Sequence, residues 1–341
     1  MICRRIALVT DAWHPQPNGV VRVMATLSEQ LEKLGHEIHV LSPNDFRTIP
    51  CPTYPEIPLA LWPSRGTARW LAQTAPDAIH IATEGPLGWA ARAWCLKQRR
   101  PFTTAYHTKF PEYIQARTGL PLAWPVAFVR RFHAPSRGVL VPSHSVYKEL
   151  QDRHFANLRQ WSHGVDTSLF HPRPKTAFGE LPRPIFLFVG RVTVDKNLPA
   201  FLDLDLPGSK VVVGSGPSRS ALIRRYPDAH FIIADNDQQL AGYFASADAL
   251  VFPSRTDTFG LVMLEALASG VPVAAFPVTG PLDVIGDSDV GVLSEDLRAA
   301  ALAALAIPAS PCVAHAARFS WSTVTHQFLD NLAYQGSGHE L

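Results

Sequence analysis

The residues of this chain best suited to chemistry lie in the phrase D-T-F-G-L-V-M-L-E-A, residues 257–266. Asp257 and Glu265 stand eight positions apart, on either side of a glycine where an apolar run of helical spacing begins. The first N–H groups of a helix have no partner inside it, and together with the helix dipole they attract anions. We therefore predict a phosphate site at the N–H groups of Gly260, Leu261 and Val262.

Two interpretations of the acids are open. Glu265 lies about 7 to 8 Å along the helix axis from the helix start, at 1.5 Å per residue. Acids on both sides of a phosphate could bind hydroxyls of two sugars, as a nucleotide-sugar presents them. Alternatively, Asp257 is a turn or cap residue and Glu265 is a solvated helix residue.

Two cations follow an earlier apolar run in the phrase G-R-V-T-V-D-K-N, residues 190–197. A diphosphate carries charge that fixed cations can neutralise, with the arginine fork and the lysine point charge in complementary roles. Arg191 and Lys196 could hold an anionic ligand in this way. The alternative is a pair of solvated loop cations.

The elements that position these residues are predicted to be short strands and helices in alternation. A strand over 249–253, a helix that ends before Gly270 and a strand over 271–276 place the acids at the carboxyl end of a strand, where open parallel sheets bind ligands. The first half repeats this pattern, with strands over 5–10 and 37–41 around a helix that begins near Gly19. A later strand, 102–106, delivers His107 to the same edge.

Composition sets the class of protein. With 341 residues, 47% of them hydrophobic, the chain can bury two cores. Its four cysteines have no C-x-x-C spacing, which disfavours zinc and disulfides, and no apolar run approaches the ~20 residues that span a bilayer.

The charge is divided unequally between the two halves of the chain. Residues 1–171 hold 19 basic and 12 acidic side chains, and residues 172–341 hold 12 basic and 17 acidic ones. The basic half suggests an anionic surface or acceptor, at a density too low for a nucleic-acid binder.

We predict a first domain over 1–171, a Pro-rich linker over 172–184, a second domain over 185–318, and a terminal helix and tail over 319–341. In the first domain, residues 120–133 form an amphipathic helix with Trp124, Phe128 and Phe132 on one side and an arginine pair beside them. This helix could lie in a membrane interface, or it could pack its aromatic residues inward and leave the arginines solvated.

These phrases resemble glycosyltransferase family 4, whose E-x7-E motif usually reads E-G-F-G-L-x-x-x-E-A. Asp257 replaces the usual first glutamate. The segment 190–197 matches the family's G-R-x-x-x-x-K-[GN] pattern, and residues 161–172 resemble its N-G-V-D-x-x-x-F segment. The resemblance implies the α/β GT-B architecture: two Rossmann-like domains with parallel sheets facing across a cleft, and a C-terminal helix that crosses back to the first domain.

The resemblance also implies a retaining, metal-independent hexosyltransferase without a cofactor, whose co-substrate is a UDP- or GDP-sugar. Asp257 would hold the transferred sugar, Glu265 the ribose and His107 the sugar near its reacting carbon, so these three are the expected catalytic residues. The expected donor-binding residues are Gly19, Arg191, Lys196, Phe259, Gly260, Leu261, Val262 and Glu265.

The acceptor that the resemblance implies is a membrane lipid such as diacylglycerol, met in the cytoplasm by peripheral contact with the anionic inner face of the cell membrane. A mannosyltransferase acting on a glycan or polysaccharide is the alternative. A non-catalytic nucleotide-sugar-binding protein is an alternative of another class. A nicotinamide dehydrogenase is disfavoured because the chain lacks G-x-G-x-x-G followed by an acid about 20 residues on.

Overall fold

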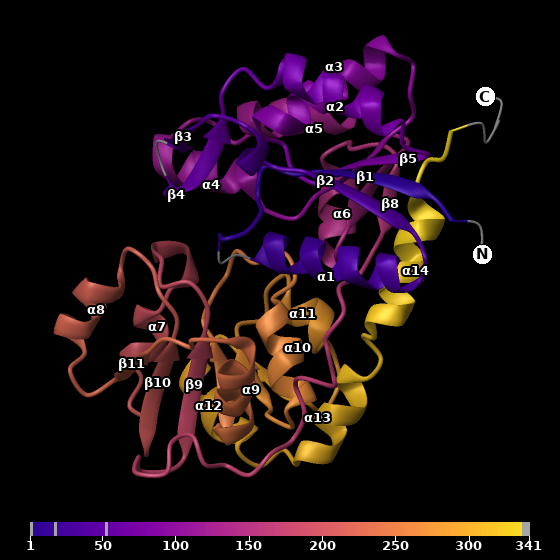
Figure 1. The fold of residues 1–341 in the computed structure, drawn as a ribbon. Helices are drawn as coiled ribbons and strands as arrows, with labels where there is room; N and C mark the ends of the chain where they lie inside the picture. Colours follow the sequence, from indigo (N-terminus) through magenta and orange to yellow (C-terminus); the bar gives the residue numbers. More distant parts are fainter. Residues whose placement is uncertain (1–2, 17–18, 52–53, 336–341) are drawn as a thin grey trace. The chain divides into compact units, whose positions relative to one another are not determined.

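The structure is a computed structural model that describes residues 3–16, 19–51 and 54–335. It divides into two compact units: Met1–Ser162 with Ser322–Leu341, and His163–Trp321. Each unit is built on a six-stranded sheet whose strands are all parallel (Figure 1). The prediction of two Rossmann-like α/β domains is therefore confirmed.

The sheet of the first unit has the strand order β2-β1-β5-β6-β7-β8. Its strands are β1 (Arg5–Val9), β2 (Glu37–Leu41), β5 (Ala78–Ile81), β6 (Thr103–Ala105), β7 (Gly138–Val141) and β8 (Leu158–Gln160). The helices of this part of the chain are α1 (Gly19–Lys33), the 3-10 turn η1 (Pro43–Asp45), α2 (Ser64–Thr74), α3 (Pro86–Lys97), α4 (Phe110–Thr118), α5 (Ala123–His133) and α6 (His144–Asp152). An antiparallel pair that we did not predict, β3 (Thr48–Cys51) and β4 (Tyr54–Ala60), is inserted before α2.

Continuous burial explains why these strands read as unbroken apolar runs. Every residue of β1 after Arg5 is fully buried, because a parallel sheet is covered on both faces. Helices α2, α3 and α5 cover one of these faces (Figure 1), where Leu71, Ala91 and Phe132 pack with strand residues in one core. The carboxyl ends of the strands are thereby left as the edge on which loops carry polar side chains.

One such side chain, Asp11, fixes the helix that follows β5. Its Oδ1 accepts from the N–H of Leu87 at 2.8 Å, and its Oδ2 accepts from the N–H of Gly88 at 3.2 Å and from the hydroxyl of Thr83 at 2.9 Å. The carboxylate thus satisfies N–H groups in the first turn of α3, as a helix start requires. Burial raises the pKa of the Asp11 carboxyl to about 6, against these hydrogen bonds, which favour the ionised form.

Asp11→Asn is expected to flatten the pH dependence of stability. Because the pKa of Asp11 is raised in the folded state, the unfolded chain loses this proton first, near the ordinary value of 3.8. The free energy of unfolding should therefore fall as the pH rises from about 4 to about 6, by roughly 2 to 3 kcal/mol, and then level off. Urea unfolding of the wild type and of the variant from pH 4 to pH 7 checks this. If the unfolding free energy depends on pH equally in the two proteins, the prediction is contradicted.

The sheet of the second unit has the order β11-β10-β9-β12-β13-β14. Its strands are β9 (Ile185–Val189), β10 (Ser209–Val213), β11 (His230–Ile232), β12 (Ala249–Phe252), β13 (Val273–Ala275) and β14 (Gly291–Leu293). Its helices are the 3-10 turn η2 (Val194–Lys196), α7 (Pro199–Leu202), α8 (Arg219–Arg225), α9 (Asp237–Ser246), α10 (Leu261–Ala268), α11 (Pro281–Val284), α12 (Leu297–Ala304) and α13 (Ala309–Ala316).

Alternate strand residues of this sheet supply two separate cores. On β9, Leu187 and Val189 pack with residues of α9 and α10, whereas Phe186 and Phe188 pack with residues of α7 and α12. This is the two-residue period of a strand. Helix α10, which carries the proposed site, has six successive buried residues, from Met263 to Ala268. The helix is therefore held firmly against the sheet.

The boundary between the units differs from the predicted one at His171. Residues from His163 onward already belong to the second unit. The ring of His163 packs on Phe259, with centroids 5.1 Å apart, and Phe170 packs on Phe244 at 5.6 Å. The predicted linker over 172–184 is likewise part of this unit, since Phe178 stacks on Tyr243. Its proline-rich composition gave no sign that Phe178 is buried.

The last helix, α14 (Trp321–Asn331), returns the chain to the first unit, as predicted. The indole N–H of Trp161 donates to the carbonyl of Val324 at 3.1 Å, and the ring of Phe328 packs on Trp161 and on His80. Beyond the helix, the N–H of Gln335 donates to the carbonyl of Asp77 at 3.0 Å. These contacts make residues 322–335 part of the core of the first unit.

The three aromatic residues of helix α5 that the sequence analysis singled out differ in their exposure to solvent. Phe132 is fully buried, but 69% of Trp124 and 48% of Phe128 are exposed, and Arg130 and Arg131 are exposed beside them. Inward packing therefore holds for Phe132 but not for Trp124, and contact of this helix with a membrane stays a prediction. Within residues 3–16, 19–51 and 54–335, no single helix is long and apolar enough to cross a membrane, while one sharply bent pair, α12 with α13, passes by length and composition alone.

Candidate active site in the second unit

The cationic loop and the acidic loop meet at the carboxyl edge of the second sheet. They follow β9 and β12, which are parallel neighbours. Lys196, at the end of η2, donates to the Oδ1 of Asp257 in an ion pair, and each side chain is 18% exposed. The amide of Asn197 also donates to the carbonyl of Pro253 at 3.2 Å, which ties the two loops together. Residues 61 positions apart in sequence thus form one site.

Asp257 keeps one acceptor available in this site. Its Oδ2 is buried and accepts no hydrogen bond from any residue in the described ranges. A buried carboxylate oxygen without a donor is costly unless a ligand supplies one. Hydroxyl groups are suitable donors, as the prediction of a sugar-binding role for Asp257 requires. The alternative of a purely structural turn residue leaves this oxygen unexplained.

Close approaches of backbone explain the glycines of the neighbouring loops. Gly190, Gly214 and Gly216 have φ of +151°, +150° and +154°. A Cβ on Gly214 would lie 2.0 Å from the carbonyl oxygen of Gly190, and one on Gly216 would lie 2.5 Å from that of Val192. Only glycine permits this contact between the loops that follow β9 and β10. The loop that carries Arg191, a half-buried residue, is thereby held at Gly190 and at Val192, the residues on either side of it.

Helix α10 begins with the predicted geometry. Gly260 is its N-cap with φ of +87°, and the helix starts at Leu261. In the described part of the chain, the N–H groups of Gly260, Leu261 and Val262 have no hydrogen-bond acceptor. Such N–H groups, together with the helix dipole, attract anions, so the geometry is compatible with the predicted phosphate site, which stays a prediction. A phosphate there would complete the helix cap.

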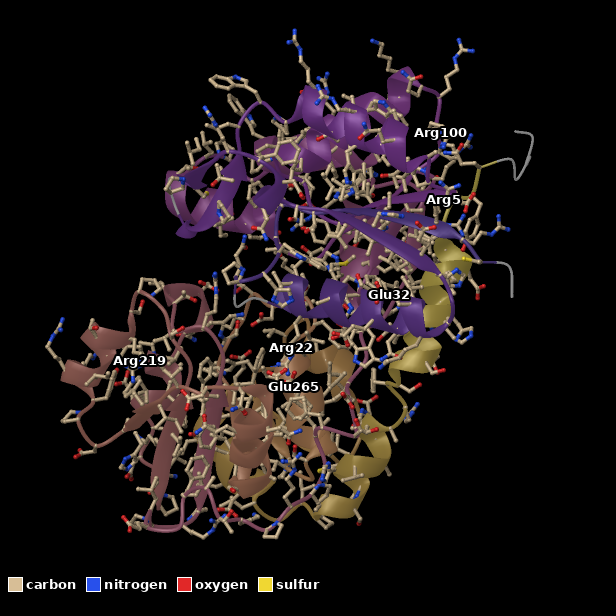
Figure 2. All side chains as sticks on the ribbon, viewed as in Figure 1. Arg5, Arg22, Glu32, Arg100, Arg219 and Glu265 are labelled. Carbon is tan, nitrogen blue, oxygen red and sulfur yellow. The ribbon has the colours of Figure 1, made fainter. Side chains whose placement is uncertain are left out.

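Glu265 and Phe259, two further predicted site residues, are both buried. Glu265 is on α10 (Figure 2) and only 4% exposed, so the interpretation as a solvated helix residue is wrong. Phe259 is 3% exposed, and its ring packs on His163 and Phe319 in the core. Any contact of Phe259 with a donor is therefore left to its backbone, because its ring is used for packing.

Two predicted residues lie in the first unit. His107 follows β6, is half-buried, and packs its ring edge-on to Trp161 with centroids 5.9 Å apart. Gly19 is the exposed first residue of α1, as predicted. Asn18, which precedes it in the family-like phrase, lies outside the described residues.

Gly260→Ala is expected to disturb both stability and activity. Its φ of +87° strains any L residue, and the new Cβ would lie 2.6 Å from the Cε of Met263. We expect a loss of about 1 to 3 kcal/mol in unfolding free energy and a fall of about tenfold in kcat/KM, because the helix start moves.

The matched control for this change is Gly119→Ala, where φ is +69° but nothing lies within 4 Å of the new Cβ. This variant should lose stability without losing catalytic efficiency. Chemical denaturation and donor-saturation kinetics of the two variants separate two effects. Backbone strain from the positive φ is common to both, whereas the contact with Met263 at the helix start occurs only in Gly260→Ala. Equal kinetics in both would contradict a role for the helix start.

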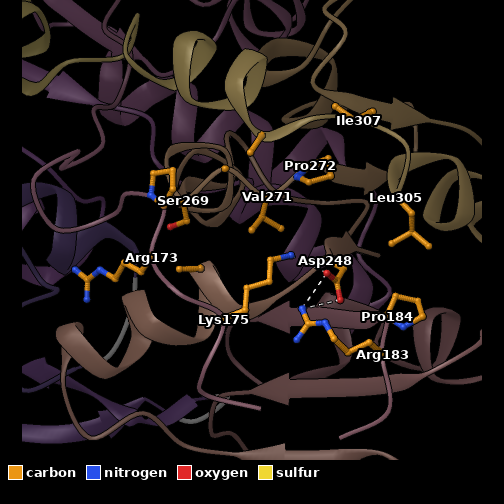
Figure 3. A pocket seen from close by; sticks show the side chains of 14 residues that line it. Arg173, Lys175, Arg183, Pro184, Asp248, Ser269, Val271, Pro272, Leu305 and Ile307 are labelled. Atoms are coloured by element: carbon orange, nitrogen blue, oxygen red, sulfur yellow. Dashed lines mark hydrogen bonds and ion pairs between the residues drawn. The ribbon is translucent and has the colours of Figure 1, made fainter. Parts of the chain in front are cut away.

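The cavity shown in Figure 3, of about 590 Å³, lies at the opposite, amino edge of the same sheet. Asp248 accepts there from Lys175 at 2.7 Å and from Arg183 at 2.9 Å. Burial alone would raise the pKa of Asp248, but these hydrogen bonds hold it below its usual value. The cations of this cavity thus pair with a structural acid, and the edge at which open parallel sheets bind ligands is the other one.

The described residues contain no group of three or more His, Cys, Asp or Glu side chains that could hold a metal ion. The site consists instead of cations, bare helix N–H groups and a carboxylate. Such groups bind a phosphorylated sugar compound directly.

Two Rossmann-like domains with this cationic, glycine-lined ligand edge define the GT-B class of glycosyltransferases. Solved structures share the fold: sucrose-phosphate synthase from Thermosynechococcus elongatus matches with a TM-score of 0.75 at 20% identity, covering 96% of this chain and 98% of that one. Anabaena Alr3699/HepE in complex with UDP matches with a TM-score of 0.70 at 14% identity, covering 96% and 98%.

The family follows from the sequence comparisons. The model of Glycosyltransferase Family 4 matches residues 17–169, and that of Glycosyl transferases group 1 matches residues 183–308. The chain belongs to the glycosyltransferases that these two models describe, so the predicted resemblance to glycosyltransferase family 4 is confirmed. It is a nucleotide-sugar-dependent glycosyltransferase that transfers a hexose.

Three curated relatives show the range of similarity. Sulfoquinovosyl transferase SQD2 of Arabidopsis thaliana is 31% identical over 84% of this chain, but the match spans only 62% of that protein. A GDP-mannose-dependent alpha-mannosyltransferase of Mycobacterium tuberculosis is 29% identical, over 85% of this chain and 83% of its own length. Alpha-monoglucosyldiacylglycerol synthase of Streptococcus pneumoniae is 29% identical, over 88% and 78%.

Sequence reasoning missed three polar residues of the first unit. Asp11, Glu84 and His133 are buried or nearly so at the carboxyl edge of its sheet or behind it. A signal for the first two existed, since each closely follows a predicted strand. His133 ends a helix, and nothing in its local sequence indicates its partners.

Proposed function

We propose that this chain is a retaining, metal-independent glycosyltransferase that moves a hexose from a UDP- or GDP-sugar to a membrane lipid such as diacylglycerol. The observation that carries the donor half is the meeting of Lys196, Asp257 and the start of α10 at one sheet edge. Arg191 and Lys196 would neutralise the leaving diphosphate, where charge develops in the transition state. Asp257 would hold the transferred sugar, Glu265 the ribose, and His107 the sugar near its reacting carbon.

The lipid acceptor is supported by the exposed side of α5. An amphipathic helix places aromatic rings at the lipid boundary and arginines against anionic headgroups. Trp124, Phe128, Arg130 and Arg131 are exposed in this arrangement. One relative has a name that specifies a glycolipid product, alpha-monoglucosyldiacylglycerol synthase. The mannosyltransferase relatives support the second candidate, transfer of mannose to a glycan acceptor.

A direct assay decides between these functions. The protein is incubated with UDP-glucose, UDP-glucuronate or GDP-mannose, with diacylglycerol in phosphatidylglycerol vesicles, with a glycan acceptor or with neither, in the presence of EDTA. A glycolipid with the donor's anomeric configuration, and nucleoside diphosphate released only with acceptor, is the expected result. Loss of activity in EDTA that magnesium or manganese restores would contradict metal independence. Donor binding with no transfer to lipid or glycan would favour a non-catalytic binding protein.

Membrane contact is tested by vesicle sedimentation. The double variant Trp124→Ala, Phe128→Ala should bind vesicles rich in phosphatidylglycerol several-fold more weakly than the wild type. Trp62→Ala is the matched control, because Trp62 is 89% exposed but lies outside α5. If the double variant and the wild type sediment equally, α5 is not the contact surface.

A further inference from the structure

A buried polar network in the first unit ends at a single accessible carboxylate. His133, 1% exposed, lies between the Oε1 of Glu84, 3.2 Å from its Nε2, and the hydroxyl of Thr104, 2.8 Å from its Nδ1. The Thr104 hydroxyl in turn lies 3.3 Å from that of Ser136. Thr104 and Ser136 are almost fully buried, whereas the side chain of Glu84 is 12% exposed. The network therefore opens to solvent at Glu84.

The chemistry of the network fixes the orientation of Glu84. An ionised carboxylate only accepts hydrogen bonds, so His133 must present a proton on Nε2 to it. The imidazole is itself held by Thr104 and by the rings of Phe132, Tyr106 and Phe155 around it. A carboxylate that a buried partner orients in this way selects the position of a bound hydroxyl group more strictly than a solvated surface acid does.

Glu84 also lies where the first unit would meet a ligand. It belongs to the loop between β5 and α3, and β5 is the parallel neighbour of β6, which leads to His107. No hydrogen bond joins its Oε2 to any residue in the described ranges. Asp11, after the neighbouring strand β1, is a second acid at this edge. The edge thus offers an oriented acceptor oxygen, although the first half of the chain is basic overall.

We propose that Glu84 binds the hydroxyl group of the sugar acceptor, that His133 is its positioning residue, and that the acceptor is electrically neutral at this group. This inference rests on the proposed transfer function and names its acceptor class. The Oε2 of Glu84 accepts the hydrogen bond of an alcohol, such as the free hydroxyl of diacylglycerol or of a neutral glycoside. A phosphate or carboxylate at the same place is repelled by the carboxylate of Glu84.

The test compares acceptor and donor kinetics in Glu84→Gln. The Michaelis constant for diacylglycerol should rise about tenfold, because an amide is a weaker acceptor than a carboxylate, while donor binding stays within twofold of the wild type. The wild type should also prefer diacylglycerol to phosphatidic acid, and the variant should lose much of this preference. His133→Phe should shift the same constant in the same direction, and His133→Gln, which keeps an N–H donor, should restore part of it.

The matched control is Glu149→Gln in the same unit. Glu149 is 26% exposed and pairs with Lys109 at 2.8 Å and Arg153 at 2.7 Å, so its loss should reduce stability and leave the acceptor constant unchanged. An unchanged acceptor constant in folded Glu84→Gln, or an equal change in the donor constant, overturns the proposal for Glu84 alone. Absence of transfer by the wild type with every donor and acceptor overturns the proposed function instead. If His133→Phe does not fold, Glu84→Gln still decides, because it alters an accessible atom.

Discussion

Lys196→Ala is expected to lower kcat/KM by ten- to over a hundredfold. The change removes charged hydrogen bonds to the leaving diphosphate, worth ~1.5 to 3 kcal/mol, and turnover efficiency follows that energy exponentially. It also leaves Asp257 without its ion-pair partner in a site where that carboxylate is 18% exposed. Arg191→Ala should have a similar effect. Steady-state kinetics with the preferred donor, on variants checked for folding by circular dichroism, provide the measurement.

Lys175→Ala is the matched control for this prediction. Lys175 also pairs with an aspartate, at 2.7 Å, but at the amino edge of the same sheet. Its loss should leave kcat/KM within twofold of the wild type. A folded Lys196→Ala enzyme with unchanged kinetics would reject the diphosphate clamp, whereas an equal loss in both variants would indicate a general effect of charge on the second unit.

Asp257→Asn should impair transfer more than folding. The asparagine keeps the size of the side chain but weakens the acceptor that the sugar hydroxyls would meet, and it leaves Lys196 without an ionised partner. We expect a fall of roughly ten- to a hundredfold in kcat/KM, in a variant that still folds.

Asp248→Asn gives the opposite pattern. Asp248 accepts from Lys175, from Arg183 and from the backbone N–H of Ile185 at 2.7 Å, where β9 begins. Its loss should cost stability and leave the turnover of the remaining folded enzyme unchanged. Urea denaturation and kinetics of both variants give a crossed comparison. Equal losses of stability and turnover in Asp257→Asn would favour a structural turn role for that residue.

Much of the donor site could be predicted because its determinants are local. The phrase at 257–266 contains its own helix start, and the observed helix begins at Leu261 after a glycine of positive φ. The cations at 191 and 196 follow a strand whose apolar run is unmistakable. Because the carboxyl ends of parallel strands share one edge, these local patterns were sufficient to place the two loops near each other.

The roles within the site were less predictable. The family resemblance assigns Lys196 to a phosphate and Asp257 to a sugar, and these roles stay predictions; the structure adds that the two side chains pair with each other. Phe259 looked like a donor contact and is a core residue, since its ring fills the space between His163 and Phe319. Such assignments depend on packing between segments that are remote in sequence.

By itself the sequence determined two Rossmann-like units, the carboxyl edges of their sheets, and the residue types available there, because strand period, helix starts and glycine turns depend on neighbouring residues. Only the tertiary structure decided that residues 163–184 belong to the second unit, that α5 presents Trp124 and Phe128 outward, and that His133 orients Glu84. The physical reason is that side chains are paired by the order of strands in a sheet, which brings together residues dozens of positions apart.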